Sequence, residues 1–276
     1  MNSLMDQIVA MENRKRRAWE KELAALPKGS LYCLYTSGKT YFFHAINGER
    51  HSISRDMDLV YLLARKKYLA LRLSEQRIAS RRATSALGSK RKQTPRGNVQ
   101  LSPLEKLLDY YGRRGLEILR ITCSRDQYLW AKADYLQNPM NPEELTHETY
   151  SGIKMRTKSE QSIGNGLEIR GIPYRYEQAM ELDVEWMEDV RGMDYFGRKI
   201  YYPDFVILTA TGEIIVWEHL GRTDLKRYRE HNMEKIAAYR EGGQFDDAHI
   251  VLSFEKDMNT PSTLEQLIER RITPYM

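Results

Sequence analysis

The positions of two carboxylates in the sequence, Asp204 and Glu218, predict that the two side chains lie close together in the folded protein. Asp204 opens an apolar run that reaches Leu208, and Glu218 closes a second run that starts at Ile214. Thr211-Gly212 between the runs predicts a hairpin turn. In an antiparallel pair the start of one strand lies opposite the end of the other, and a lone charge beside a buried strand is costly. The pattern therefore predicts two neighbouring acids that share a cation.

The cation expected between these acids is Mg²⁺, with Mn²⁺ able to substitute. Two adjacent carboxylates repel each other unless a divalent ion lies between them, and Mg²⁺ prefers a few hard oxygen ligands and keeps open positions. Glu160, on a helix expected just before the strands, is the third candidate ligand. A metal held in this way can lower the pKa of bound water and neutralise a phosphate during displacement.

Four short motifs occur in order on the expected elements: Lys158-Ser159-Glu160, Tyr176-Glu177, Pro203-Asp204-Phe205 and Trp217-Glu218-His219. At these residues the sequence resembles the PD-(D/E)XK nuclease superfamily, and within it uncharacterised bacterial and phage-borne members, over residues 157–276. The resemblance implies an α/β fold of the restriction-endonuclease-like type, with an αβββαβ core around a central mixed sheet. It also implies that Glu160, Asp204 and Glu218 bind the metal and act in catalysis.

One position departs from the superfamily pattern, because Leu220 stands where a lysine is expected two residues after the glutamate. The following helix can supply that lysine. Asp224, Tyr228, His231, Lys235 and Tyr239 recur at helical spacing on one face. In a catalytic role, Lys235 would orient the attacking water or stabilise phosphate charge. The alternative is that Lys235 is exposed and only pairs with charged residues one helical turn away. With Tyr239 it resembles the Gln-x-x-x-Tyr motif of exonuclease-like branches.

Three further residues are secondary candidates. Lys158 is the rival to Lys235 and is otherwise a solvated residue of a first helical turn. His219 follows Glu218, so strict strand alternation points it to the opposite face; a structural role and a second-layer or phosphate-contacting role are both open. Glu177 can join the acid cluster or form a salt bridge at the sheet edge.

The elements that must position these residues follow one another as helix, strands, helix and strand. Thr157 with Glu160 three residues later is a helix-capping signature. The expected helices cover 157–170, 224–240 and 261–271, and the expected strands cover 174–177, 180–184, 200–210, 213–219 and 249–254.

The first half of the chain predicts a different architecture. A helix over 4–26 precedes strands at 30–35 and 40–44 and a turn at Asn47-Gly48, which together predict a small meander. A long helix over 56–82 follows, and shorter helices are expected at 103–114 and 124–138. The expected division is an N-terminal region at 1–83, a mobile basic linker at 84–101, a helical connector at 102–150 and the nuclease-like domain at 151–276.

Basic residues concentrate in the long helix and the linker. Such a run can neutralise phosphates and release counterions, which favours nucleic-acid binding; the alternative is a solvated helix face and linker. The candidate phosphate contacts are Arg65, Lys66, Lys67, Arg72, Arg81, Arg82, Lys90, Arg91 and Lys92.

The composition of the chain limits the classes of protein to which it can belong. The chain has 276 residues, of which 41% are hydrophobic, and a net charge of +5, so it can bury a real core. Its two cysteines, Cys33 and Cys123, lie far apart and predict neither a disulfide framework nor a zinc site. No apolar stretch is long enough to cross a membrane and no signal core is present. We therefore expect a cytoplasmic protein with no membrane partner.

Three functions are compatible with these patterns. The first is a Mg²⁺-dependent nuclease that hydrolyses DNA phosphodiester bonds. The second is a DNA-binding module that keeps the fold and has lost cleavage, as the missing lysine at Leu220 would allow. The third, a metal hydrolase acting on small phosphates, leaves the basic helix without a use. A homodimer or a second mobile-element protein is an expected partner, and endonuclease and exonuclease activity are both open.

Overall fold

The computed structural model describes residues 4–86, 102–184, 197–221, 226–243 and 245–276. The chain forms two compact units, unit 1 over Met1–Thr122 and unit 2 over Cys123–Met276. The expected helical connector over 102–150 is thus divided between the units. The expected linker over 84–101 lies almost wholly outside the described residues, because the long helix extends to Ala86.

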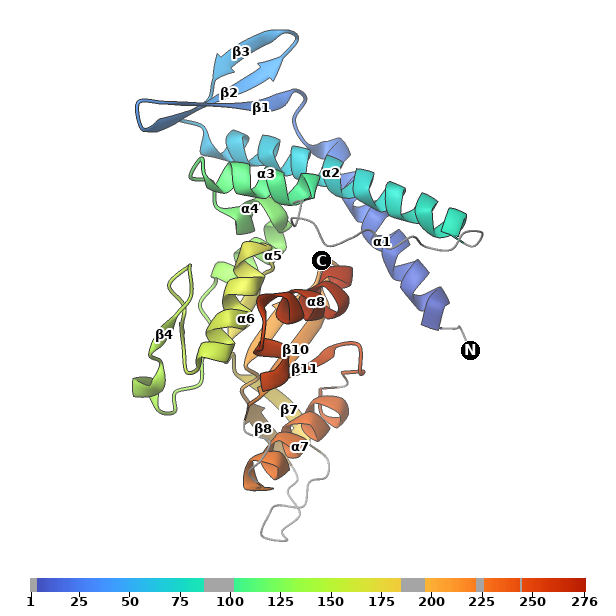
Figure 1. The fold of residues 1–276 in the computed structure, drawn as a ribbon, viewed down its shortest axis with the longest axis vertical. Coiled ribbons are helices and arrows are strands. Elements are labelled where there is room, and N and C mark those ends of the chain that lie inside the picture. Colours follow the sequence, from blue (N-terminus) through green and yellow to red (C-terminus); the bar gives the residue numbers. More distant parts are fainter. Residues whose placement is uncertain (1–3, 87–101, 185–196, 222–225, 244) are drawn as a thin grey trace. The chain divides into compact units, whose positions relative to one another are not determined.

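Unit 1 combines a small antiparallel meander with helices (Figure 1). The sheet order is β1-β2-β3, which confirms the expected meander. The elements in chain order are α1 (Leu4–Ala25), β1 (Ser30–Thr36), β2 (Lys39–Ile46), β3 (Glu49–Ser52), α2 (Met57–Ala86), α3 (Pro103–Gly112) and α4 (Ile118–Thr122).

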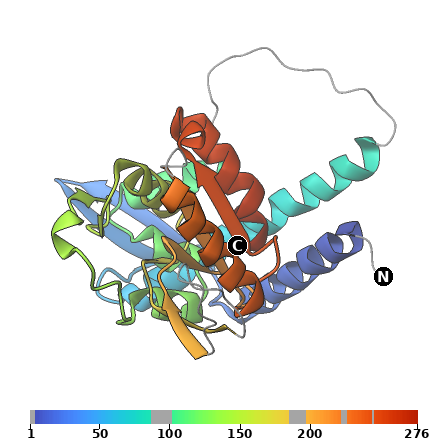
Figure 2. The ribbon, with the colours of Figure 1, turned by 90° about the horizontal axis from the view of Figure 1, so that it is seen from below.

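Helices α1 and α2 of unit 1 run alongside each other in opposite directions (Figure 2). Residues in the first half of α1 contact residues in the second half of α2, since Gln76 donates to Glu12 at 2.7 Å. Nearer the end of α1, Glu22 accepts from Arg65 in the first half of α2. Side chains from both helices and from the sheet form one hydrophobic core, made chiefly of Trp19, Cys33, Phe42, Val60, Ala64, Tyr68, Leu69, Leu73, Tyr111, Leu116 and Ile121.

Unit 2 is a mixed α/β unit around a four-stranded sheet of order β11-β10-β9-β6. Strands β6, β9 and β10 are antiparallel neighbours, and β11 runs parallel to β10. The elements are α5 (Arg125–Lys132), β4 (His147–Glu148), β5 (Lys154–Met155), α6 (Lys158–Ile169), β6 (Tyr174–Tyr176), β7 (Met180–Val184), β8 (Gly197–Tyr201), β9 (Phe205–Leu208), β10 (Ile214–Leu220), α7 (Lys226–Glu241), β11 (Ile250–Phe254) and α8 (Pro261–Arg271), with single 3₁₀ turns at Pro142–Glu144, Glu255–Met258 and Thr273–Tyr275.

The expected single strand over 200–210 is wrong. Two strands occupy this stretch: β8 pairs with β7 in a separate hairpin, and β9 belongs to the four-stranded sheet. Pro203 lies between them and has no amide hydrogen to donate to a ladder. The break places Asp204 immediately before β9 rather than inside a strand.

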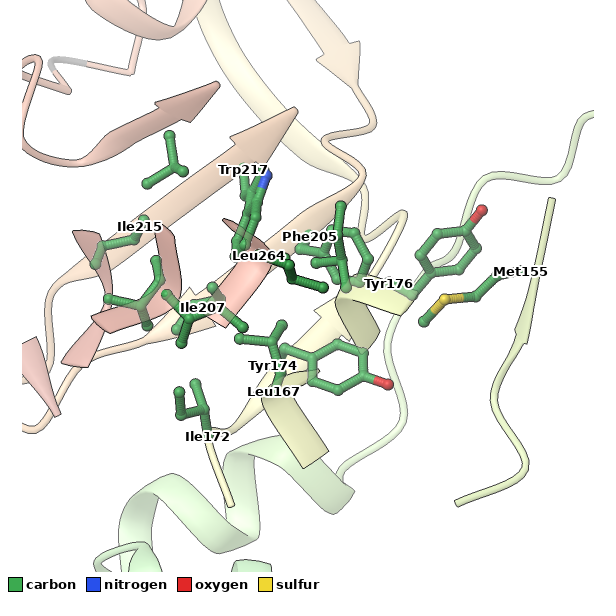
Figure 3. Close-up of a cluster of buried hydrophobic side chains, with 14 residues drawn as sticks. Met155, Leu167, Ile172, Tyr174, Tyr176, Phe205, Ile207, Ile215, Trp217 and Leu264 are labelled. Carbon is green, nitrogen blue, oxygen red and sulfur yellow. The ribbon is translucent and has the colours of Figure 1, made fainter. Parts of the chain in front are cut away.

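Helices cover both faces of the four-stranded sheet. Residues of α6 and α8 pack with β6, β9, β10 and β11 on one face, where the rings of Tyr174 and Tyr176 lie 5.6 and 5.7 Å from that of Phe205 (Figure 3). On the other face α7 supplies Ala238 and Tyr239, which pack with the β7–β8 hairpin and with β10 and β11. Alternate residues of β9 and β10 therefore face different helices.

Local sequence signals account for the helix that precedes the sheet. The Thr157 hydroxyl accepts from the Glu160 amide at 3.1 Å, and the Glu160 carboxylate accepts from the Thr157 amide at 2.9 Å. This reciprocal pair is the predicted capping box. Cys33 and Cys123 are both buried free thiols. Among the described residues no helix combines the length and the apolar character that crossing a membrane requires.

Candidate active site

Asp204 and Glu218 lie beside each other at one end of the β9–β10 pair. The last paired residues of that ladder are Phe205 and Trp217, so the next position on each strand holds an acid. The His219 amide donates to Asp204 Oδ2 at 2.6 Å, which joins the two positions across the strands. Glu218 is buried and Asp204 is half-buried. The predicted meeting of the two acids is confirmed.

Helix α7 brings two further side chains to Glu218. Lys235 Nζ donates to Glu218 Oε2 at 2.7 Å, and the Tyr239 hydroxyl donates to Glu218 Oε1 at 2.5 Å. Lys235 Nζ also donates to the carbonyl of Tyr202 at 3.0 Å. The expectation that this helix face turns toward the acids is confirmed for Lys235 and Tyr239.

The other members of that predicted face do not reach the acids or cannot be placed. The His231 side chain is exposed and lies 4.0 Å from Glu234 Oε2. Asp224 and the side chain of Tyr228 lie outside the described residues. Two residues one helical turn apart thus contribute to the site.

Burial and neighbouring charges of the same sign dominate the electrostatics of Asp204. Withdrawal from water raises the pKa of Asp204 well above its usual range, and the charges of Glu218 and Glu160 raise it further. The Lys235 ammonium and the His219 amide lower it only in part. Burial and the charge of Glu218 also raise the pKa of Tyr239 well above its usual value, so this phenol stays a proton donor.

Glu160 serves the cap of α6. Its Oε2 accepts from the amides of Arg156 and Thr157 at 3.2 and 2.9 Å and from the Tyr176 hydroxyl at 2.9 Å. Within the described ranges no three His, Cys, Asp or Glu side chains are grouped closely enough to hold a metal ion. The structure therefore brings Asp204 and Glu218 together and leaves Glu160 at the helix cap, near enough to act on the pKa of Asp204.

The donor set of the acid pair suits a hard divalent cation. Both groups offer carboxylate oxygens, and they lie at neighbouring ends of paired strands. Mg²⁺ is commonly held by one or two carboxylates, with water and substrate phosphate completing its shell. Asp204 and Glu218 therefore fit such an ion without a third acid.

Glu177 forms the salt bridge that was one of its two predicted outcomes. Its two oxygens accept from Arg156 Nε and Nη2 at 2.7 and 3.0 Å, and the carboxylate is buried. Its backbone amide donates to the Asp204 carbonyl at 3.1 Å. Glu177 therefore supports the backbone of Asp204, while its own carboxylate is engaged with arginine.

His219 points away from Glu218, as strand alternation predicts. Its Nδ1 lies 3.0 Å from Ser253 Oγ near the end of β11, and its Nε2 lies 3.2 Å from Glu255 Oε1 just after that strand. Trp217 Nε1 donates to the same serine at 2.8 Å. The side chain thus ties β10 to β11. Lys158, in contrast, is exposed in the first turn of α6.

Two of the basic residues assigned to nucleic acid are engaged inside unit 1, which corrects that expectation. Arg65 is buried, with Nε and Nη2 donating to Glu22 at 2.7 and 2.9 Å and Nη1 donating to the carbonyl of Ile121 at 3.0 Å. Lys66 Nζ donates to the carbonyls of Pro27 and Gly29 at 2.7 and 3.0 Å. These cations are hydrogen-bonded to Glu22 and to backbone carbonyls of unit 1, so they are not available to phosphates.

Among the remaining candidate phosphate contacts, the structure describes the side chains of two, Arg72 and Lys67. Arg72 lies over the Trp19 ring at 5.0 Å, and Lys67 is exposed. The side chains of Arg81 and Arg82 and all of Lys90, Arg91 and Lys92 lie outside what the structure describes.

Two contributors to the site were missed from the sequence. The Tyr176 hydroxyl reaches Glu160, and the Tyr202 carbonyl accepts from Lys235. Tyr176 stands in one of the four motifs, so its position was a usable signal. A carbonyl carries no side-chain signal at all.

No family model matches the chain, and no curated protein or solved structure is significantly similar to it. The geometry around Asp204 and Glu218 therefore provides the grounds for a functional proposal.

Proposed function

We propose that the protein is a Mg²⁺-dependent nuclease of the PD-(D/E)XK type that hydrolyses phosphodiester bonds of DNA. The observation that carries the proposal is the contact of Lys235 with Glu218, beside Asp204. It joins two acids and a lysine in one site although Leu220 occupies the usual lysine position.

The order of elements in unit 2 supports the proposal. Helix α6, strands β6, β9 and β10, helix α7 and strand β11 follow one another as an αβββαβ series. The antiparallel and parallel pairings make the sheet mixed, with the two acids at neighbouring ends of β9 and β10. This order agrees with the core that the resemblance implies and supports the proposal, with strands β7 and β8 placed after the first strand of the series.

Each residue has a role that its contacts allow. Asp204 and Glu218 would hold the metal, and Tyr239 fixes the orientation of the Glu218 carboxylate through its hydroxyl. Lys235 places an ammonium beside the acids, where it orients the attacking water or stabilises charge on a phosphate oxygen. The bound Mg²⁺ would supply acidified water and neutralise phosphate charge.

The second candidate function is a DNA-binding module without cleavage. Both oxygens of Glu218 already accept hydrogen bonds from Lys235 and Tyr239, and Glu160 is engaged at the helix cap. These contacts favour a structural role for the acids, in which their oxygens stay hydrogen-bonded within the protein and do not take part in cleavage. The two candidates differ in a single measurable property, which is turnover.

Cleavage assays separate the two candidates. Purified protein is incubated with supercoiled, linear and single-stranded DNA in the presence of Mg²⁺ or Mn²⁺. Asp204→Ala should abolish cleavage, whereas Asp134→Ala, which removes an exposed carboxylate from unit 2, should not. Cleavage that survives Asp204→Ala sinks the proposal. DNA that is bound but never cut under these conditions favours the second candidate.

A further inference from the structure

The meander of unit 1 has two chemically different faces. Along β1 and β2 alternate side chains point to opposite sides. Cys33 and Phe42 are paired neighbours and point inward to the core of unit 1. The residues on either side of each along its strand point outward, where Tyr32 pairs with Phe43 and Leu34 pairs with Tyr41.

The outward face is apolar and exposed. Tyr32, Leu34 and Tyr41 keep 37, 41 and 40% of their surface accessible. The rings of Tyr32 and Phe43 lie 6.1 Å apart and form a row across the two strands. Helix α2 lies against the inward face, and no described element of unit 1 covers the outward one (Figure 1). Large exposed side chains that gather in this way mark a binding surface.

The charges on this face are all positive. The guanidinium of Arg50 lies 4.0 Å from the centre of the Tyr32 ring, and Lys39 is exposed at the start of β2. Glu49 is the one acid in the three strands; it pairs with Ile46 on the inward face, and its carboxylate lies 3.3 Å from His51 Nε2. The outward face thus combines aromatic rings with unopposed cations.

We propose that the outward face of β1–β3 binds single-stranded nucleic acid. Tyr32 and Tyr41 would stack on unpaired bases, and Arg50 and Lys39 would contact the phosphates between them. Aromatic side chains interleaved with cations bind single strands in this manner, because every base has a π-face. A duplex keeps its bases stacked on one another, so an open sheet face cannot reach them.

This surface lies in a different unit from Asp204 and Glu218, and its function goes beyond the proposed nuclease reaction. Binding can be measured without divalent cation, in EDTA, where a metal-dependent cut cannot occur. Failure of the binding proposal and failure of the cleavage proposal are therefore distinguishable.

The test uses the full chain and fluorescence anisotropy. The probes are labelled oligothymidylate, oligouridylate and a duplex of equal length, and the first two separate DNA from RNA. Tyr32→Ala and Tyr41→Ala should each weaken single-strand binding about tenfold. Arg50→Ala should reduce the slope of log affinity against log salt by about one.

Matched variants make the outcome specific. Tyr32→Phe keeps the ring and should bind like the wild type, as should Tyr150→Ala, which removes an exposed tyrosine of unit 2. Circular dichroism confirms that each variant is folded. The proposal is overturned if a folded Tyr32→Ala/Tyr41→Ala variant binds the single strand as tightly as the wild type or if this variant loses as much affinity for the duplex as for the single strand. It is also overturned if no single-stranded probe binds, and sedimentation of the wild type and of Tyr32→Ala then tests whether the face joins two copies of the chain instead.

Discussion

Lys235 on α7 donates a 2.7 Å hydrogen bond to Glu218 on β10, seventeen residues earlier in the chain. The same ammonium donates to the carbonyl of Tyr202, which lies in the segment that leads into Asp204. One lysine therefore contacts the Glu218 carboxylate and also the backbone just before Asp204. This arrangement explains how a chain with Leu220 after its glutamate can still place a cation at the site.

Replacement of Lys235 should decide between the two lysine candidates. Lys235→Ala removes the ammonium that contacts Glu218, and we expect cleavage to fall by about two orders of magnitude or more. Lys158→Ala removes an exposed side chain and should leave cleavage within about twofold. Steady-state rates on one DNA substrate measure both effects, and an equal loss in the two variants would contradict this assignment.

Mg²⁺ should stabilise the protein through Asp204. An ion that binds only the folded state raises stability by about 2.7 kcal/mol at a hundredfold excess over Kd, which corresponds to a rise in Tm of about 5 °C or more for a chain of this size. Asp204→Asn should lose this response. In EDTA it should melt above the wild type, because it removes the carboxyl whose pKa is raised by burial and by Glu218. Equal Mg²⁺ responses in the two proteins would argue against metal binding at this pair.

The pH dependence of stability should carry a signature of Lys15. Burial lowers the pKa of Lys15 from 10.5 to about 8, with a further lowering by Arg72 and a partial offset by Glu12. Between these values the unfolded chain binds the proton and the folded chain does not, so stability rises with pH. The gain from pH 7.5 to 9.5 is about 2 kcal/mol at most.

Urea denaturation at those two pH values tests this expectation. Lys15→Met keeps the apolar stem and removes the titrating group, so the rise should be smaller in the variant than in the wild type. Identical pH profiles for the two proteins would show that Lys15 is not the source.

Arg65 should be required for the stability of unit 1. Arg65→Ala leaves the Glu22 carboxylate and the carbonyls of Ile121 and Thr122 without their donor. We expect a loss of about 2–3 kcal/mol, reduced from the full value of a buried pair because Glu22 is partly exposed.

The matched control is Lys67→Ala on the same helix, since Lys67 is exposed. Its unfolding free energy should stay within about 0.5 kcal/mol of the wild type. The pair Arg65→Met with Glu22→Met should recover part of the loss, because it leaves no charge unpaired. If Arg65→Ala and Lys67→Ala unfold alike, the inward role of Arg65 is refuted.

Local chemistry made part of the structure predictable. The capping box of Thr157 and Glu160 fixes the start of α6, and the end of α8 at Arg271 agrees with its expected limit. The placing of Lys235 and Tyr239 was also accessible, because helical spacing depends only on residues within the same helix. These signals act over one or two turns.

Features that depend on distant partners were not predictable. The apolar run from Ile200 to Ala210 looks continuous, yet its two halves pair with β7 and with β10 in different sheets. Arg65 resembles its basic neighbours until Glu22, 43 residues away, is brought beside it. Sheet membership and charge burial are decided by such pairings, and single-strand or single-helix patterns do not contain them.

The two thiols of the chain have a practical consequence for spectroscopy. Cys33 and Cys123 are buried, one in each unit, so a cysteine introduced at an exposed position such as Lys67 or Asp134 would be the accessible site for a maleimide dye. A pair of dyes at these positions would report by energy transfer on any change in the distance between the two units when nucleic acid is added, with both native cysteines kept in place.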